Sequence, residues 1–296
     1  MGFESLVHQV NDKFKFYVNN VEVPGCRKPV FFYHVQKSGG LTFSNTLSIS
    51  LRSRGFKFAR ADTDEHLEDI SDGSQYSLIC SHKKFGIHER IKASEHRLVT
   101  FLRDPFYRVR SAYTYRQMRA QQDVTEQGFE AFYLDPENQN LACKQLLGED
   151  YYPGCAEAVF ANLERNFFAF ATSDRIDDMI SYFLSDFELC NVLTENLNQT
   201  LDKYKIDASA HKPIVESLNK DDVELYNLVQ SGPRIPENLD LEVQQISMKT
   251  AIFFEVEKEK ASVTNGVEVD TPQLFNVLSN LAQTGKSVTL EQLVGR

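Results

Sequence analysis

The apolar positions of the chain change their period at a pair of glycines near residue 40. Residues 30–33, Val-Phe-Phe-Tyr, form an unbroken apolar run that is typical of a short buried strand. After Thr42 the apolar residues recur at helical spacing, at Phe43, Leu47 and Leu51. We therefore predict a strand over 30–33, a Gly-rich turn, and a helix that ends near Arg54 with Gly55 as its C-cap.

Further strand and helix patterns follow along the chain. Strands are expected at 57–61, 76–80, 97–102 and 167–171, and helices at 141–147, 155–166, 175–187 and 219–230. Residues 1–29 form an amphipathic lead-in with a turn at Pro24-Gly25, and two short helices are expected near 272–283 and 288–294. These strands and helices are those expected of an α/β protein.

A further helix is expected directly after the strand at 97–102. Asp104 is a good N-cap and Pro105 a good first helical residue. Three residues at helical spacing form its predicted buried stripe: Phe106, Val109 and Tyr113. Four arginines are placed on its other faces: Arg108, Arg110, Arg116 and Arg119.

Composition places the 296-residue chain among globular proteins, as one large α/β domain or two small ones. A net charge of −10 argues against general nucleic-acid binding, which depends on clustered Lys and Arg. The five cysteines contain no Cys-x-x-Cys pair, so we expect no metal site, while pairing of Cys143 with Cys155 stays open. We expect no signal peptide and no membrane segment.

The turn at 37–40, Lys-Ser-Gly-Gly, is the first candidate for chemistry. A Gly-rich turn that opens a helix leaves backbone N–H groups free to bind a phosphate, and Lys37 adds a positive charge beside them. The common nucleotide loop is excluded because the lysine precedes the glycines here. The alternative is an ordinary corner between a strand and a helix.

Two other predicted strands end in polar residues. His82 follows the strand at 76–80, where ligands of open α/β sheets bind, and the alternative is a surface loop that happens to contain histidines and lysines. Arg103 ends the strand at 97–102, and Ser111 lies about two turns into the next helix. A guanidinium and a hydroxyl suit a second phosphate. Alternatively, Arg103 pairs with Asp104 or another carboxylate.

Three segments together resemble one family. They are Lys37-Ser38-Gly39-Gly40-Leu41-Thr42, Ser81-His82 with Phe85-Gly86, and Leu102-Arg103-Asp104-Pro105 with Arg108 and Ser111-Ala112-Tyr113. In order and spacing they resemble the carbohydrate O-sulfotransferases related to heparan sulfate 2-O-sulfotransferase and the chondroitin and dermatan enzymes. The resemblance covers about residues 28–230, and it implies an α/β fold with a P-loop-like parallel sheet flanked by helices. It also implies a sulfotransferase domain over 1–232 with a C-terminal extension, 233–296, of unknown role.

The resemblance also implies the chemistry. The donor would be 3′-phosphoadenosine 5′-phosphosulfate (PAPS), the product 3′-phosphoadenosine 5′-phosphate (PAP), and the acceptor a hydroxyl, most simply on a glycan. The 5′-phosphosulfate would be bound by Lys37, Ser38, Gly39, Gly40, Leu41 and Thr42, and the 3′-phosphate by Arg103 and Ser111. Lys37 would also neutralise the leaving oxygen, and His82 would act as general base, with no metal required.

The chain departs from the family pattern at three positions: Gln36 for a usual Pro, Leu41 for a usual Thr, and Ser81 for a usual Gly. The backbone donors survive these changes, although Leu41 removes a hydroxyl. A nucleotide kinase-like phosphotransferase and a non-catalytic glycan- or anion-binding protein on this scaffold remain alternatives. His88 is a rival base. The expected location is the cytoplasm, or the Golgi lumen if the chain is truncated, and the acceptor and oligomeric state stay open.

Overall fold

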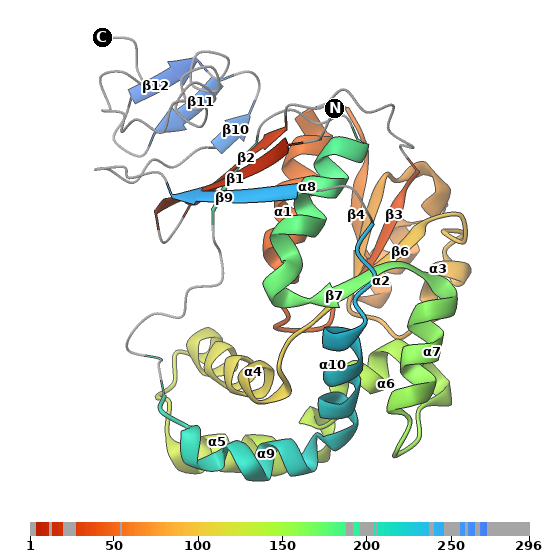
Figure 1. Cartoon of the computed structure of the whole chain (residues 1–296), viewed down its shortest axis with the longest axis vertical. Coiled ribbons are helices and arrows are strands. Elements are labelled where there is room, and N and C mark those ends of the chain that lie inside the picture. The colour runs from red at the N-terminus through yellow and green to blue at the C-terminus, as the bar shows by residue number, and fades with distance from the viewer. Residues whose placement is uncertain are drawn as a thin grey trace.

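A five-stranded parallel sheet lies at the centre of the computed structural model (Figure 1). Its order is β4-β5-β3-β6-β7, and the strands are β3 (Val30–Tyr33), β4 (Phe58–Arg60), β5 (Leu78–Ser81), β6 (Arg97–Leu102) and β7 (Phe167–Thr172). Because β3 lies between β5 and β6, the turns that follow these three strands meet at one edge of the sheet. The predicted α/β class with flanking helices is confirmed.

The structure describes residues 4–11, 14–19, 28–53, 55–70, 72–187, 192–195, 204, 206–236, 240–245, 255–257, 260–263 and 267–270.

Both faces of the sheet are buried under helices. On one face, Val30 and Phe32 pack with α1 (Gly40–Ser53) and α8 (Ile176–Asp186). On the other, Phe31 and Tyr33 pack in a cluster formed largely by α6 (Leu141–Leu147), α7 (Ala156–Asn166) and α10 (Lys220–Ser231). Successive residues of a strand point to opposite faces, so the unbroken apolar run of β3 fits a sheet that is covered on both sides.

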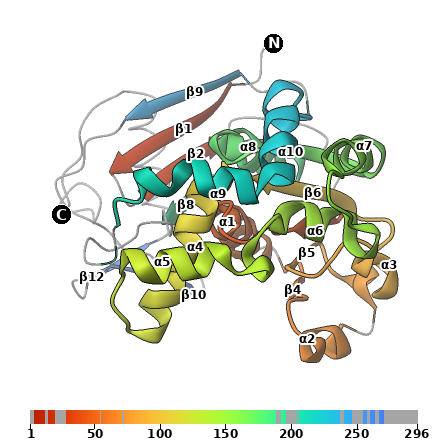
Figure 2. The same cartoon turned by 90° about the horizontal axis from the view of Figure 1, so that it is seen from below.

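A third group of helices follows β6 and lies below the sheet in Figure 1 and together in Figure 2. It contains α4 (Pro105–Ala120), α5 (Glu126–Leu134) and α9 (Lys212–Leu218). The predicted stripe of α4 is buried, with Phe106, Val109 and Tyr113 each at most 2% exposed. The sequence analysis did not predict the burial of Arg108, whose side chain is 1% exposed and contacts buried polar groups of other elements.

The connections contain short elements. They are α2 (Asp64–Asp69), α3 (Ile87–Arg90) and 3₁₀ turns at Gly73–Gln75, Pro136–Asn138, Gly148–Asp150, Ser173–Arg175 and Ser209–His211. Cys143 and Cys155 are buried free thiols in this structure.

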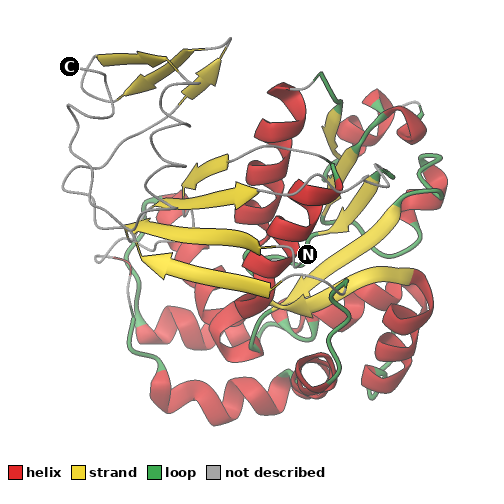
Figure 3. Ribbon diagram, turned by 45° about the horizontal axis from the view of Figure 1, so that its top comes forward, coloured by secondary structure: helices red, strands yellow, loops and turns green. Residues whose placement is uncertain are grey.

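A second sheet, β8-β2-β1-β9, packs against α1 and α8 (Figure 3). Its strands are β1 (Glu4–Asn11), β2 (Phe14–Asn19), β8 (Val192–Glu195) and β9 (Asp240–Gln245), and a third sheet contains β10 (Glu255–Glu257), β11 (Lys260–Val263) and β12 (Val267–Asp270). The predicted lead-in thus contains two strands, and β9 of the predicted extension pairs with β1 in parallel. The predicted turn at Pro24-Gly25 and the helices near 272–283 and 288–294 lie outside the described residues.

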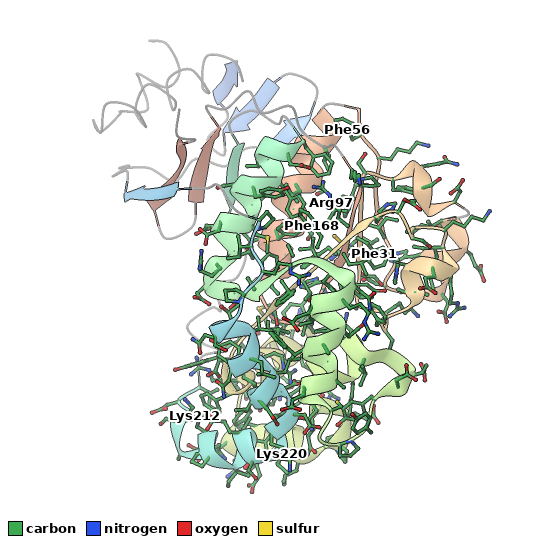
Figure 4. The ribbon with its side chains drawn as sticks, turned by 45° about the vertical axis from the view of Figure 1, so that its right-hand side comes forward. Phe31, Phe56, Arg97, Phe168, Lys212 and Lys220 are labelled. Carbon is green, nitrogen blue, oxygen red and sulfur yellow. The ribbon has the colours of Figure 1, made fainter. Side chains whose placement is uncertain are left out.

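A buried ion pair joins the end of α8 to the amino end of the sheet. Nη2 of Arg97, at the start of β6, lies 2.5 Å from Oδ2 of Asp186 at the end of α8. The guanidinium also lies 5.0 Å from the ring centre of Phe168, which Figure 4 shows beside it. The contacts fix the last turn of α8 to the amino end of the sheet, opposite the edge that carries the candidate site.

Candidate active site

The turn between β3 and α1 has a backbone that few residues adopt. Lys37 has φ 65° and Gly39 φ 86°, both in the left-handed region. Gly40 is needed for another reason: a Cβ there would lie 2.2 Å from Cδ2 of His34 and 2.7 Å from Cζ of Phe32. The first turn of α1 therefore packs directly against the rings that precede the turn.

Ser38 is buried inside this turn, and its hydroxyl has no hydrogen-bond partner among the described residues. A buried hydroxyl without a partner is destabilising unless a ligand or water satisfies it. Together with the opening of α1, the turn has the donors that bind a phosphate or sulfate group.

Two cations flank the turn. Arg103, at the end of β6, donates from Nη1 to the backbone oxygen of Lys37 at 3.3 Å. Burial lowers the pKa of Lys37, and the charge of Arg103 lowers it further. Burial also lowers the pKa of Arg103, with Arg110 contributing. Neither cation has an ion pair in the described part of the chain, since Asp104 instead caps α4 by accepting from the Tyr107 N–H.

His82 is fixed at the end of β5 by two hydrogen bonds. Its backbone N–H donates to Oδ1 of Asp62 at 2.9 Å, and its ring Nδ1 donates to the backbone oxygen of His34 at 2.7 Å. A carbonyl oxygen only accepts, so the neutral ring carries its proton on Nδ1 and keeps the lone pair of Nε2 for an incoming proton. Gln145 of α6 donates to the same His34 oxygen at 3.4 Å and fixes the following loop at Lys83.

His34 lies against the candidate base. Its buried ring stacks on Phe32 and lies 4.4 Å from the His82 ring, measured between centroids. Burial lowers the pKa of His34 well below its ordinary value, and the positive charges of His82, Arg60 and Lys37 lower it further. This imidazole is therefore neutral near pH 7.

His88, the rival base, has a structural environment. It is buried, its Nδ1 lies 2.6 Å from the Tyr33 hydroxyl, and its ring packs against Phe31 and Phe85. Burial lowers the pKa of His88. Its hydrogen bond and packing are those of a satisfied core histidine.

The other predicted residues lie along the same edge. Thr42 is buried in the first turn of α1, and its N–H donates to the Gly39 oxygen. Leu41 and Ser111 are half-buried, on α1 and α4. The sequence analysis missed three neighbours of the site: His34, Gln145 and Tyr115. The ring of Tyr115 lies under the Lys37 ammonium. The position of His34 between a strand and the Lys-Ser-Gly-Gly turn was the available signal, whereas Gln145 gave none.

Part of the chain, including these elements, is similar to a known protein family. Residues 26–147 match the model of the sulfotransferase family. The sulfotransferase match includes the turn after β3, His82, Arg103 and Ser111, and it supports sulfuryl transfer in general. No curated protein matches the chain.

Two kinds of feature are absent from the described residues. They contain no helix that is both long and apolar enough to cross a bilayer. Nor do they contain a group of three or more His, Cys, Asp or Glu side chains arranged to hold a metal ion.

Proposed function

We propose that the chain transfers a sulfuryl group from PAPS to a hydroxyl of a carbohydrate acceptor. The observation that carries the proposal is the turn 37–40, in which the buried Ser38 hydroxyl has no hydrogen-bond partner among the described residues. Two cations lie beside it, Lys37 and Arg103, and no described carboxylate forms an ion pair with either. The sulfotransferase match over the same residues supports it.

The residues present fit an anionic donor. Ser38 and the backbone N–H groups at Gly39 and Gly40 would bind its 5′-phosphosulfate, with Leu41 and Thr42 in the first turn of α1. Arg103 and Ser111 would bind its 3′-phosphate, a role for which a guanidinium fork is suited. PAPS supplies a sulfuryl group on a phosphate leaving group.

The proposed reaction needs a base and a positive charge at opposite ends of the transferred group. His82 has the tautomer for the first role, since Nε2 can take the proton of the acceptor hydroxyl while Nδ1 donates to His34. Lys37 would place its ammonium beside the leaving oxygen as negative charge develops there. PAP then leaves with the electron pair of the broken S–O bond, and His82 releases its proton to solvent.

Ligand-dependent melting tests the donor. We expect PAP to raise the melting temperature more than ADP, because only PAP has the 3′-phosphate for Arg103 and Ser111. PAP at about 100 times its dissociation constant adds about 2.7 kcal/mol of stability. Arg103→Ala should remove the preference for PAP, whereas Arg116→Ala, on an exposed part of α4, should keep it.

Equal or greater stabilisation by ADP or ATP would contradict the donor assignment and favour the kinase-like phosphotransferase. Transfer of label from radiolabelled PAPS to a panel of glycans, tyrosine peptides and small alcohols tests the reaction and the acceptor. Binding of PAP without transfer to any of them would favour the non-catalytic binding protein.

A further inference from the structure

Tyr115 of α4 lies beside the candidate site although no family motif quoted above contains it. Its ring is 37% exposed, and Nζ of Lys37 lies 4.0 Å from the ring centroid. Tyr115 is one helical turn beyond Ser111, so both residues lie on the same face of α4. An aromatic ring at this distance and a lysine ammonium attract each other, because the face of the ring is electron-rich.

The contact matters because the charged groups described near Lys37 are positive. Arg103 lies close enough to lower the pKa of Lys37, and His34 behind it is neutral. A second cation, Arg119, has its guanidinium carbon 6.0 Å from the Tyr115 ring centroid. No carboxylate within the described residues forms an ion pair with Lys37. The ring face is thus an electron-rich group in contact with an ammonium that otherwise faces positive charge.

We propose that Tyr115 is a positioning residue that fixes the Lys37 ammonium over the turn through the face of its ring. A lysine side chain has four rotatable carbons and many rotamers, and holding it in place before the reaction removes that disorder from the barrier. The ring leaves the other N–H donors of the ammonium free for an anion. This inference rests on the proposed function, because it assigns Lys37 a role at the leaving group.

The test compares two substitutions of one residue. Tyr115→Leu removes the aromatic face, whereas Tyr115→Phe keeps it and removes only the hydroxyl. We expect Tyr115→Leu to lower kcat about 2- to 30-fold with a smaller change in the KM for PAPS, the range that a cation–π contact spans. Tyr115→Phe should lower kcat much less than Tyr115→Leu does. Tyr152→Leu is the matched control, since Tyr152 is a similarly exposed tyrosine, 52% accessible, far along the chain from the turn.

A second readout does not depend on activity. Competitive acylation across a pH series, followed by mass spectrometry, measures the titration of the Lys37 amine in the full chain. Tyr115→Leu should lower this midpoint by about 0.4–1.5 pH units, because the ring stabilises the charged form. In Tyr115→Phe, the midpoint of the Lys37 amine should stay closer to that of the wild type. Tyr115→Gln, which also lacks a ring, repeats the measurement if the leucine variant folds poorly.

The outcomes separate the two proposals. An unchanged Lys37 titration in both ringless variants, or equal kcat losses in Tyr115→Leu and Tyr115→Phe, would overturn the positioning role. Failure of the wild-type chain to prefer PAP over ADP would instead contradict the donor, and the amine titration would still report whether Tyr115 stabilises the Lys37 ammonium.

Discussion

Two histidines near the carboxyl edge of the sheet differ in what their ring nitrogens contact. His82 donates from Nδ1 to a backbone oxygen and lies half-buried at the candidate site, whereas His88 is buried against Tyr33. We expect His82→Ala to lower kcat by about 10²–10⁴-fold, the usual contribution of a positioned base, with PAP affinity near wild type. The acid limb of kcat/KM against pH should disappear with it.

His88→Ala is the matched control and should show the opposite pattern. It removes a buried ring and leaves the Tyr33 hydroxyl without this partner, so about 1–3 kcal/mol of stability should be lost. Its kcat at a temperature where it is folded should fall clearly less than that of His82→Ala. A larger kcat loss in His88→Ala, measured on folded protein, would assign the base to His88.

The turn before α1 depends on close packing between elements. Gly40→Ala should lower stability by about 1–3 kcal/mol and weaken PAP binding, because the new methyl would overlap His34 and Phe32. Gly55→Ala, just beyond the other end of α1, is the control: Gly55 has φ 78° and nothing within 4 Å of an added Cβ. It should cost about 1 kcal/mol of backbone strain and leave PAP binding unchanged. Calorimetry on both variants checks this, and equal PAP affinities would contradict the close-packing argument.

A buried polar network links α4, α6 and α10 behind the candidate site. Nη2 of Arg108 donates to Oδ1 of Asn219 at 3.3 Å and lies 3.7 Å from Oδ2 of Asp222. The Asp222 carboxylate also accepts from the N–H groups of Ala142 and Cys143, which open α6. Since α6 carries Gln145, the network positions the helix that holds the His34 oxygen.

Breaking this network on one side should be costly. Arg108→Met leaves the Asp222 charge buried and should lower the free energy of unfolding in urea by about 3–5 kcal/mol. The double variant Arg108→Met/Asp222→Leu should lose less than the sum of the two single variants, because it leaves no unpaired charge. Additive losses would show that the two side chains do not interact.

The sequence pattern predicted the bounds of those helices and strands that depend on neighbouring residues in the chain. The strands at 30–33 and 97–102 and the helix at 141–147 have the predicted bounds, because buried strands read as apolar runs and Gly148 ends the helix with φ 72°. The burial of Arg108 was missed, since its partner Asp222 lies far along the chain. Helix α9 was not predicted either, and the pairing of β1 with β9 was missed because the two strands lie far apart along the chain.

The residue pattern alone located the parts of the candidate site separately, and only the family resemblance combined them into one donor site. The sequence indicated the turn at 37–40, His82 and Arg103 as separate strand ends, and the parallel order β5-β3-β6 brings those ends to one edge. The tautomer of His82 depends on a backbone oxygen, and the contact of Lys37 with Tyr115 depends on how α4 packs. Neither the tautomer nor this contact can be predicted from the spacing of residues in the sequence. The domain boundary at 232 and the roles of individual residues stay predictions.

Three buried histidines of the described residues link the stability of the whole molecule to pH. His34, His88 and His96 are each at most 6% exposed, and burial lowers the pKa of each, that of His34 well below its ordinary value. In the unfolded chain each would take up a proton as the pH falls through about 6.5. The unfolded state then binds more protons than the folded state, so the free energy of unfolding must decrease as the pH falls below that value.

The expected decrease between pH 7 and 5.5 is about 1 kcal/mol for each histidine that stays neutral when folded, and so about 1–4 kcal/mol in all. Urea unfolding at a series of pH values measures it, with full stability expected above pH 7 as far as these groups are concerned. His96→Gln, away from the candidate site, should reduce the decrease by up to about a third, because one titrating group is removed. Stability that is flat from pH 7 to 5.5 would show that the three rings take up protons in the folded state as readily as in the unfolded chain.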